Sequence, residues 1–392
     1  MAASGNTVAL GARSAMSMRL LVFAPTRRAP TETFVRANLQ GLPFEIIAYF
    51  GDEQPLSDPG RLAYGLAILV SKALTRLGLL RLATLPGSLV AWCLIRRHQP
   101  DVLMTEFGFH AVRVMEAAAW SDTPLIVHFR GSDASAQNRL GLLKDRYRRL
   151  MVIVSGIIVK SQPMRRTLLA LGAPNDHLIV SPSGADERLF HGADPGRSSP
   201  LLVAVGRFVA KKGPLQTIRA FAAMRQSLPE PVALSTKLVM LGDGPLLAEA
   251  RQLVEALALG SAVILPGLAD RQRVAELLRQ ARCFVQHSQV APDGDREGSP
   301  VAVMEAQLSG LPVVATRHEG IPEVVEDGVS GFLVDEGDLQ GMAAAMARLI
   351  VEPDLAARLG AAGKRRAAAN FTARHHLEQI AALLRKVIQE SR

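Results

Sequence analysis

The sequence predicts an α/β protein in which two Rossmann-like domains, each with a doubly wound parallel sheet, face each other across a cleft. The chain has 392 residues, and 48% of them are hydrophobic. A chain of this length is longer than a single domain usually is, and it has enough hydrophobic residues to form two hydrophobic cores. Short apolar segments alternate with helical patterns, which is typical of parallel sheets. The alternation restarts after residues 181–199, a linker rich in Gly, Pro, Ser and Asp.

The first half of the chain supplies one series of strands. The segment MRLLVFAP, residues 18–25, has the apolar character of a buried strand and ends at a proline. A helical pattern follows, with Thr31 as a suitable N-cap and Gly41 as a stop. Residues 60–98 are also helical in pattern. The further strands predicted in this half are residues 44–50, 101–107, 124–130 and 156–161.

The second half repeats the arrangement, and the two halves give the domain boundaries. Its predicted strands are residues 200–207, 235–242, 261–267, 281–288 and 311–317. We expect residues 1–17 to be a disordered extension, because they lack the long apolar region of a signal peptide. Residues 18–190 then form the N-terminal domain and residues 191–371 the C-terminal domain. Residues 372–392 have the pattern of an amphipathic helix, which we expect to return to the N-terminal domain.

The charge is positive and uneven. The formal net charge is +9, and residues 1–195 contain 22 Lys and Arg against 15 Asp and Glu. Such an excess favours an anionic partner. Aromatic residues are 5% of the chain and no nucleic-acid-binding signature is present, so we expect no nucleic-acid partner. Anionic lipid or a phosphorylated substrate fits the charge at least as well. Cys93 and Cys283 lie far apart without metal-ligand spacing, which suits a reducing cytoplasm.

The stretch DREGSPVAVMEAQLSG, residues 295–310, contains a helix start after a long loop. Ser299 is a suitable N-cap and Pro300 a suitable first helical residue. The N–H groups of Val301 and Ala302 would then be free. Because unpaired N–H groups at a helix start attract anions, this end is predicted to bind phosphate.

Two glutamates flank that helix start. Glu297 precedes it, directly before Gly298, and Glu305 lies two turns inside the helix. A nucleotide diphosphate sugar has the same order of groups: ribose, two phosphates and sugar. The prediction is that Glu305 takes the ribose hydroxyls, the helix end takes phosphate and Glu297 takes sugar hydroxyls. Two unrelated surface glutamates with this spacing are the alternative, since such pairs occur by chance.

A basic loop follows the first predicted strand of the second domain. The segment VAVGRFVAKKGP, residues 203–214, contains Arg207 and Lys212, which can neutralise a diphosphate leaving group. A solvated basic loop is the alternative. The segment LGDGP, residues 241–245, places Gly242 in a turn at another strand end, with or without a ligand contact.

These motifs together resemble a known family. The second half is similar to the retaining nucleotide-sugar glycosyltransferases of glycosyltransferase family four, which have the GT-B fold. The first half, in VHFRGSD and APTRRAPTETFV, resembles members that build bacterial exopolysaccharides, of the colanic-acid type, and lipid-linked oligosaccharides. The matching segments of the second half, in order, are Gly-Arg at 206–207, Lys-Gly at 212–213, GDGP at 242–245, the paired glutamates, and GIPEVVEDGVSGFLV at 320–334.

The resemblance implies roles for the matched residues. Arg207 and Lys212 would bind the pyrophosphate, Glu297 would contact the donor sugar and Glu305 would contact the ribose. The C-terminal domain would thus bind the nucleotide sugar and the N-terminal domain the acceptor. The remaining donor-binding positions that follow from the motifs are Gly242, Gly298, Ser299 and Val301.

The N-terminal half departs from the family at one position. The loop of Thr31, Glu32 and Thr33 would lie at the cleft, beside the acceptor. The family usually has His before Gly in its H-G-x-D pattern, near the transferred sugar, but this chain has Arg130. His128 lies two residues earlier, on the same strand face, and either takes over the role or is a packed histidine. Arg130 would either face an anion in the cleft, namely the donor's phosphates, Glu297 or an acidic substrate group, or form a structural salt bridge with Asp133 or another acid of its own domain.

A basic segment suggests where the enzyme works. Residues 59–100 contain no Asp or Glu, but six Lys and Arg among apolar residues. A basic amphipathic face predicts binding to an anionic membrane surface, whereas the alternative is a core helix with a solvated basic face. We therefore expect a cytoplasmic protein, peripheral on the inner face of the cytoplasmic membrane.

The sequence as a whole predicts a retaining, metal-independent glycosyltransferase. It would move a sugar from a nucleotide diphosphate sugar to a lipid-linked or exopolysaccharide acceptor, with no cofactor. The DGD motif at residues 293–295 is interpreted as a polar loop, because Arg207 and Lys212 already offer positive charge. A phosphorylase with the same fold and a non-catalytic protein that binds nucleotide sugars remain the alternatives.

Overall fold

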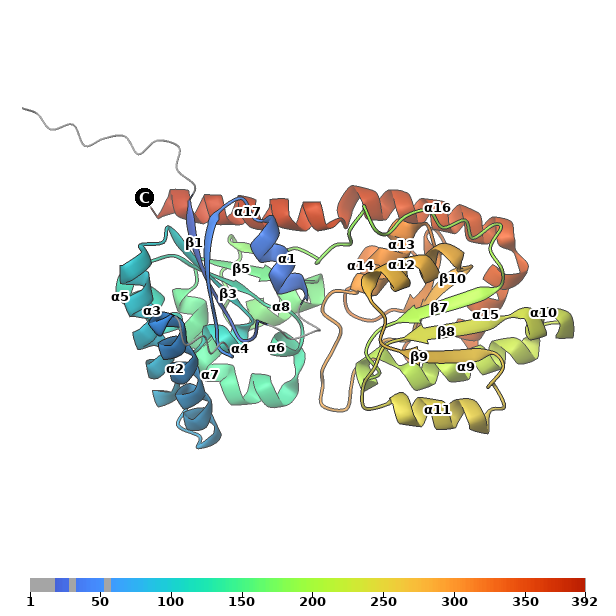
Figure 1. Ribbon diagram of the computed structural model, residues 1–392, viewed down its shortest axis with the longest axis horizontal. Coiled ribbons are helices and arrows are strands. Elements are labelled where there is room, and N and C mark those ends of the chain that lie inside the picture. Colours follow the sequence, from blue (N-terminus) through green and yellow to red (C-terminus); the bar gives the residue numbers. More distant parts are fainter. Residues whose placement is uncertain (1–17, 28–32, 53–57, 392) are drawn as a thin grey trace, which may run out of the picture.

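The computed structural model describes residues 18–27, 33–52 and 58–391 (Figure 1). It contains two six-stranded parallel sheets in separate domains, and two long terminal helices run along one side of both. The predicted α/β class and the pair of Rossmann-like domains are confirmed. The expected extension, residues 1–17, lies outside the described residues.

The N-terminal sheet has the strand order β2-β1-β3-β4-β5-β6. Along its strands, side chains alternate between two cores, because successive residues of a strand point to opposite faces. In β1, Leu21 and Phe23 enter one core and Leu20 and Val22 the other. The strands are β1 (Arg19–Ala24), β2 (Glu45–Phe50), β3 (Val102–Glu106), β4 (Leu125–His128), β5 (Gly156–Val159) and β6 (Leu178–Val180).

Helices cover both faces of this sheet. One core lies beneath α2–α5, α7 and α8, and the other beneath the C-terminal helix α17, with α1 at its margin. The helices of this domain are α1 (Thr33–Gly41), α2 (Pro59–Arg76), the 3₁₀ turn η1 (Leu82–Thr84), α3 (Leu85–His98), α4 (Gly108–Ala111), α5 (Met115–Ser121), α6 (Ser132–Ser135), α7 (Gln137–Ile153) and α8 (Gln162–Ala170).

The C-terminal sheet has the order β12-β11-β10-β7-β8-β9. Its strands are β7 (Leu201–Val205), β8 (Lys237–Leu241), β9 (Val263–Gly267), β10 (Cys283–Gln286), β11 (Val313–Thr316) and β12 (Gly331–Val334). The helices on its two faces are η2 (Ala210–Lys212), α9 (Pro214–Ser227), α10 (Glu230–Ser235), α11 (Leu247–Ala256), α12 (Arg271–Gln280), α13 (Val301–Ser309), α14 (Ile321–Val324), α15 (Leu339–Val351) and α16 (Pro353–Asn370).

Three elements differ from the expectation. The strands β6 and β12 were not predicted, because runs of three and four residues give too little alternation to recognise. The helical stretch 60–98 is broken between α2 and α3, where Gly78 has a φ of +76°. Glycine adopts this left-handed conformation without strain, so the two helices can fold back against each other.

The chain crosses between the domains twice, and the two crossings lie side by side. Ala185 and Thr372 form a parallel bridge, and the N–H of Ala185 donates to the carbonyl of Phe371 at 2.8 Å. From there α17 (Ala373–Glu390) packs on the N-terminal sheet through Ile380 and Leu384. Phe190, placed by the sequence in the N-terminal domain, is buried in the C-terminal core.

The strand orders locate the ligand crevice of each sheet. In the C-terminal sheet the chain proceeds outward from β7 to β9 and then returns to place β10 on the other side of β7. In the N-terminal sheet the corresponding reversal lies between β1 and β3. Ligands of open parallel sheets bind at the carboxyl ends of the strands beside such a reversal. The loops after β7 and β10 are therefore the first place to look for a site.

Candidate active site

The loop after β7 presents two cations at the carboxyl edge of the C-terminal sheet. Arg207 is exposed, and its guanidinium has no acid partner in the part of the chain that the structure describes. Lys212 ends the turn η2 and forms an ion pair with Glu297. The next residue, Gly213, has a φ of +51°, and a Cβ there would meet the carbonyl oxygen of His287 at 1.9 Å. Glycine thus lets the loop after β7 pack directly beneath the loop after β10.

The loop after β10 holds Glu297 as an ionised acceptor. Only 8% of its surface is exposed, and its carboxylate contacts Lys212. Burial alone would raise the pKa of Glu297, but the adjacent charges of Lys212 and Lys211 and the hydrogen bond from Lys212 bring it below the ordinary value. The two residues assigned to phosphate and sugar are therefore paired with each other in the absence of a ligand.

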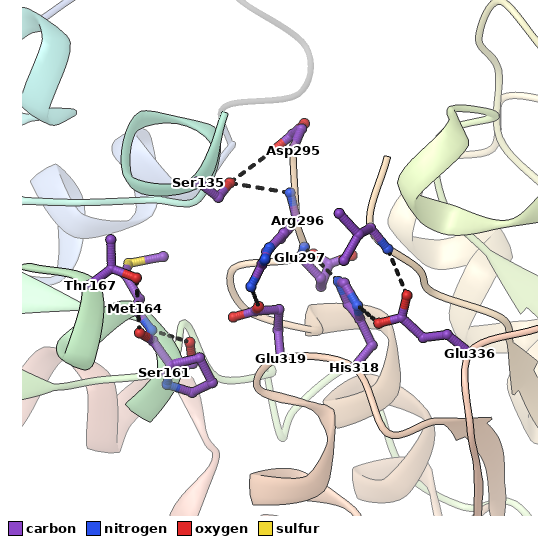
Figure 2. A network of polar contacts seen from close by, with 12 residues as sticks. Ser135, Ser161, Met164, Thr167, Asp295, Arg296, Glu297, His318, Glu319 and Glu336 are labelled. Carbon is purple, nitrogen blue, oxygen red and sulfur yellow. Dashed lines mark hydrogen bonds and ion pairs between the residues drawn. The ribbon is translucent and has the colours of Figure 1, made fainter. Parts of the chain in front are cut away.

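A relay of two side chains fixes the backbone of Glu297. Its N–H donates to Nε2 of His318 at 3.1 Å, and Nδ1 of His318 lies 2.6 Å from a carboxylate oxygen of Glu336. Because Nε2 accepts, the proton of the imidazole is on Nδ1 and is donated to Glu336. The second oxygen of Glu336 accepts from the N–H of Val290 at 2.9 Å. Figure 2 shows His318 between Glu297 and Glu336, so this pair holds both ends of the loop.

A second ion pair anchors the middle of the loop. Nζ of Lys211, which is buried, lies 2.9 Å from Asp295 and donates to the carbonyl of Arg296 at 3.1 Å. The carboxylate of Asp293 accepts from the N–H of Asp295 at 3.1 Å. The second Asp of the DGD motif therefore positions the loop. Among the described residues, no group of three or more His, Cys, Asp or Glu could hold a metal ion, and the expectation of a metal-independent reaction stays a prediction.

The helix α13 starts one residue later than expected. Pro300 is the N-cap, and no side chain caps the helix. The prediction that Ser299 caps it is wrong, because its hydroxyl instead accepts from the N–H of Ser183, in the segment between the domains, at 2.9 Å. The N–H of Val301 is also occupied, by the carbonyl of Ser299 at 2.9 Å. In the described structure the N–H of Ala302 has no partner, so it is the one of the predicted pair that remains for an anion.

Glu305 lies inside α13 with its carboxyl partly buried. Burial raises the pKa of Glu305 to about 7, against the opposing charges of Arg271 and Lys212. The structure records no hydrogen bond to this carboxyl among the described residues. A partly desolvated carboxyl without a partner is suited to accept hydrogen bonds from ligand hydroxyls.

Gly242 has a structural role. Its φ is +142°, and a Cβ there would meet the carbonyl oxygen of Gly206 at 1.9 Å. Its N–H donates to the carbonyl of Gly267 at 2.8 Å, so it has no free donor for a ligand. Gly242 instead lets the loop after β8 lie against the start of the loop after β7.

On the N-terminal side, Arg130 is turned inward. Its guanidinium contacts the carboxylate of Glu106, with Nη2 at 2.6 Å and Nε at 2.8 Å, and 5% of its side chain is exposed. Glu106 is fully buried at the end of β3 and also accepts from Nδ2 of Asn38 at 3.2 Å. Of the two alternatives for Arg130, the structure therefore shows the structural salt bridge. Its partner is Glu106 and not Asp133. Only its backbone reaches the cleft, where a Cβ on Gly298 would meet the Arg130 carbonyl oxygen at 2.2 Å.

His128 is also withdrawn from the cleft. It is fully buried, and its ring faces α17, with His376 at a centroid distance of 5.5 Å. Burial, with the charges of Arg130 and Lys160, lowers the pKa of His128 well below the usual range. The suggestion that it contacts the sugar is therefore wrong for this conformation. The packed-histidine alternative describes it, because strand alternation sends His128 to the face covered by α17.

A buried charge cluster thus fills the space between this sheet edge and α17. We use that name for Glu106, His128, Arg130, Lys160 and His376. Nζ of Lys160 donates to the carbonyl of Ser181 at 3.1 Å, and the Ser181 hydroxyl lies 2.7 Å from Nδ1 of His376. Burial lowers the pKa of Lys160 well below the usual range, and the pKa of His376 likewise. The cluster ties the C-terminal helix to the strand ends at the cleft.

Asp133 shapes the backbone that does reach the cleft. Its buried carboxylate accepts from the N–H groups of Gly108 at 2.9 Å, Arg130 at 2.9 Å and Gly131 at 2.8 Å. These three bonds hold the loops after β3 and β4 together. Gly131, with a φ of +154°, lies directly opposite Gly298. The segment Gly131–Asp133 therefore forms one place where the backbones of the two domains meet.

Several polar contacts join the domains around a pocket of about 230 Å³. The Ser135 hydroxyl accepts from the N–H of Arg296 at 3.1 Å and donates to Asp295 at 3.3 Å. Across the pocket, Nη1 of Arg296 lies 2.9 Å from the carboxylate of Glu319 (Figure 2). The residues lining the pocket are Gly131, Ala134, Ser135, Leu140, Met164 and Thr167 from one domain and Gly294, Arg296, Glu297 and Glu319 from the other.

The loop expected at the acceptor side is only partly described. Thr31 and Glu32 lie outside the described residues. Thr33 is the first residue of α1. The contact of this loop with an acceptor therefore stays a prediction.

The sequence reasoning missed the residues that hold the site. His318 and Glu319 follow β11 directly, in the run TRHEG, and Glu336 follows β12. Their position at the carboxyl ends of neighbouring strands is the signal that would have indicated them. Lys211 was also missed. It is adjacent to Lys212 in a short turn, where neighbouring side chains point in different directions, and it therefore pairs with Asp295 while Lys212 pairs with Glu297.

Two families match the chain, one for each domain. Residues 38–189 match Glycosyltransferase Family 4, and residues 189–366 match Glycosyl transferases group 1. AmsK of Erwinia amylovora, an amylovoran biosynthesis glycosyltransferase, is 32% identical over 254 residues, which are 64% of this chain and 61% of AmsK. WcaL of Salmonella typhimurium, named for colanic acid biosynthesis, is 33% identical over 262 residues, which are 66% of this chain and 63% of WcaL. The match spans about three fifths of the length of both relatives.

Solved structures share the fold over nearly the whole chain. HepE of Anabaena, solved in complex with UDP, superposes with a TM-score of 0.70 at 18% identity and covers 94% of this chain and 100% of its own. Sucrose-phosphate synthase of Thermosynechococcus elongatus gives a TM-score of 0.70 at 17% identity and covers 95% of this chain and 100% of its own. The C-terminal domain therefore belongs to the group 1 glycosyltransferases and the N-terminal domain to glycosyltransferase family 4, and the chain has the GT-B fold.

Proposed function

We propose that this protein transfers a sugar from a nucleotide diphosphate sugar to a lipid-linked or exopolysaccharide acceptor, with retention of configuration and without a metal. The observation that carries the proposal is the contact between Lys212 and Glu297 at the β7–β10 reversal, with the exposed Arg207 beside it. A cation pair for phosphate and a carboxylate for sugar hydroxyls meet there on two loops that the fold brings together.

The ion pair suggests how donor binding rearranges the site. A diphosphate has more negative charge than one carboxylate, so it attracts Lys212 away from Glu297. Glu297 then becomes free to accept hydrogen bonds from the sugar, while His318 and Glu336 keep its backbone in place. Glu305, four residues into α13, is available to the ribose. HepE was solved in complex with UDP and glucose, which supports a nucleotide sugar as the donor class.

The chemistry follows from the groups at the leaving phosphate. Arg207, Lys212 and the N–H of Ala302 stabilise the negative charge that develops as the bond between sugar and phosphate breaks. In this scheme the donor has drawn Lys212 away from Glu297, and the Glu297 carboxylate is a hydrogen-bond acceptor for the sugar hydroxyls. The departing phosphate takes the proton of the acceptor hydroxyl as that hydroxyl attacks from the same face. Retention of configuration follows from this geometry.

The acceptor is assigned from the relatives and the charge. AmsK and WcaL are named for the biosynthesis of amylovoran and colanic acid, which supports a polysaccharide intermediate as acceptor. The positive first half and the acid-free segment 59–100 support a location at the inner face of the cytoplasmic membrane. The interdomain pocket beside Glu297 is the space available to the acceptor hydroxyl.

The proposal is tested with a panel of nucleotide sugars. Ligand that binds only the native state raises the melting temperature, so thermal shift identifies the donor. The purified protein should then hydrolyse that donor slowly in the absence of acceptor, and Glu297→Gln should abolish the hydrolysis. A rise in melting temperature without any hydrolysis would instead indicate a non-catalytic nucleotide-sugar-binding protein. Release of sugar 1-phosphate only when inorganic phosphate is added would indicate a phosphorylase.

A further inference from the structure

The helical hairpin of α2, η1 and α3 exposes apolar side chains on its outer face. The exposed positions of α2 before its last residue, Arg76, are apolar, and those of α3 begin with Leu85 and Leu89. The connection between the helices adds Leu77, which is 72% exposed, and its neighbours. The exposed large apolar residues of this hairpin are Leu66, Leu69, Val70, Leu77, Leu79, Leu82, Leu85 and Leu89, which we name the leucine ridge.

The outer face of α2 differs in polarity from that of an ordinary surface helix. In α11, for comparison, the exposed positions include Glu249, Arg251 and Glu255, while Ala250 and Val254 face the core. The helix α2 also buries an apolar face, through Tyr64 and Ile68, but its outer face is apolar too. Contiguous apolar surface of this kind marks a site of contact with another apolar phase.

The charged residues of the hairpin itself are all basic, although Asp52 lies beside Leu66 and Leu69. Residues 59–100 contain no acid, and Arg76 and Arg81 are exposed at either end of the connection between the helices. Arg96 and Arg97 are exposed at the far end of α3. An apolar strip with a basic margin complements an anionic bilayer, where leucine enters the acyl boundary and arginine meets the lipid phosphates.

The place of the ridge in the molecule fits this partner. The hairpin lies at the end of the N-terminal domain away from the C-terminal domain (Figure 1). A pocket of about 380 Å³ runs from the ridge at Leu66 and Leu69 to Gly51, directly after β2 at the carboxyl edge of the sheet. Any surface in contact with the leucine ridge therefore lies next to the carboxyl edge of the N-terminal sheet, where the acceptor would enter. No described helix is both long and apolar enough to cross a membrane.

We propose that the leucine ridge is a membrane-docking surface that inserts its exposed leucines into the interface of an anionic bilayer. The inference deepens the membrane location in the proposed function, and it requires neither the donor nor the reaction. Apolar insertion contributes most of the affinity, and Arg76 and Arg81 add the preference for anionic lipid.

Co-sedimentation of the full chain with phosphatidylcholine vesicles, with and without phosphatidylglycerol, tests the proposal. The triple variant Leu77→Ser, Leu79→Ser, Leu82→Ser should lower the partition coefficient on anionic vesicles by about tenfold or more. The matched control replaces three apolar residues elsewhere that are at least as exposed, Val152→Ser, Leu234→Ser and Leu268→Ser, and should bind as the wild type does. Arg76→Gln with Arg81→Gln should weaken anionic binding roughly fivefold per arginine. It should leave binding to neutral vesicles unchanged.

Two further measurements separate this proposal from folding and from catalysis. Leu77→Trp should shift its fluorescence to the blue when anionic vesicles are added, whereas Leu268→Trp should not. The affinity for the donor nucleotide, measured without lipid, should be the same in all of these variants. Negligible sedimentation of the wild type with anionic vesicles at low salt would overturn the proposal. So would equal losses in the ridge and control variants. Normal vesicle binding by a protein that binds no nucleotide would contradict only the proposed reaction.

Discussion

The two sheet edges that face each other across the cleft use their charged residues in opposite ways. At the C-terminal edge, Arg207, Lys212 and Glu297 remain at the surface of the crevice or just beneath it. At the N-terminal edge, Glu106 and Arg130 turn inward and form a buried charge cluster with residues of α17. The same position in the same type of fold thus holds charged groups at the crevice in one domain and a buried network in the other.

The difference shows what a strand end does and does not determine. A residue at the carboxyl end of a parallel strand has its backbone at the crevice in both domains. The direction of its side chain depends on the nearest partner of opposite charge. Arg130 has the buried Glu106 within 2.6 Å, whereas Arg207 has no such acid. A cation without a partner in the protein is the one available to a ligand.

The largest expected effect comes from breaking the buried cluster. Glu106→Ala leaves Arg130 as a buried charge without its partner, which should lower the free energy of unfolding by about 3–5 kcal/mol. The control is Glu45→Ala, which removes the ion pair between Arg19 and Glu45. Both of those side chains are more than two-fifths exposed, so the control should cost less than about 1 kcal/mol. Urea unfolding of both variants measures the difference, and equal losses would show that the cluster is not a buried charge network.

Glu305 provides a test through pH. Because burial raises the pKa of this carboxyl to about 7, the native state holds its proton more tightly than the unfolded chain does. The associated stability is present below pH 4.5 and is lost as the pH rises through 7. Glu305→Gln should therefore leave acid stability unchanged and stabilise the free protein at pH 8, by an amount on the order of 3 kcal/mol at most. The same variant should weaken nucleotide binding.

Melting curves of the wild type and Glu305→Gln at pH 5 and pH 8 make that comparison, and Glu249→Gln, on an exposed face of α11, is the control. If Glu305 binds the ribose, Glu305→Gln gains stability at pH 8 and loses nucleotide affinity. Identical pH profiles for the wild type and Glu305→Gln would remove Glu305 from the site.

A variant of His318 tests how the C-terminal sheet edge positions Glu297. His318→Ala removes the acceptor of the Glu297 N–H and the donor to Glu336, so the Glu297 carboxylate loses its fixed position. Misplacement of a catalytic group by about 1 Å costs roughly 100-fold in rate, so kcat should fall by about that factor with little change in KM. His318→Gln can accept and donate in the same two directions and should restore most of kcat. A purely structural role would lower the melting temperature and leave kcat unchanged.

The smallest expected effect concerns the contact between the domains. Ser135→Ala removes the hydroxyl that bonds the N–H of Arg296 and the carboxylate of Asp295. One such hydrogen bond contributes about 1 kcal/mol, so the ratio of open to closed molecules should rise about fivefold. Small-angle scattering without ligand would detect the more extended form, and Ser198→Ala, which removes a hydrogen bond to the Asp194 carbonyl within one turn, serves as the control. An unchanged scattering profile would indicate that Ser135 does not hold the domains together.

The sequence predicted the fold because each longer strand is an apolar run beside a helical pattern, as in β1 and β7. It also indicated the loop that carries Glu297, since Ser299 and Pro300 predict a helix start after a strand, although the N-cap proved to be Pro300. It did not predict the inward direction of Arg130, because the partner, Glu106, lies 24 residues away and meets it only when β3 and β4 pair. The His318–Glu336 relay was missed for the same reason, since its members follow two different strands.

We infer that Lys212 is a phosphate ligand that Glu297 holds until the donor binds. Calorimetry of the wild type, Lys212→Ala and Glu297→Gln with the identified nucleoside diphosphate, and with its nucleoside, measures this. Lys212→Ala should lose roughly 1.5–3 kcal/mol of binding free energy for the diphosphate and almost none for the nucleoside. Glu297→Gln, which releases Lys212, should bind the diphosphate at least as tightly as the wild type does. Equal losses of nucleoside and diphosphate affinity in Lys212→Ala, or a weakened diphosphate in Glu297→Gln, would contradict the account.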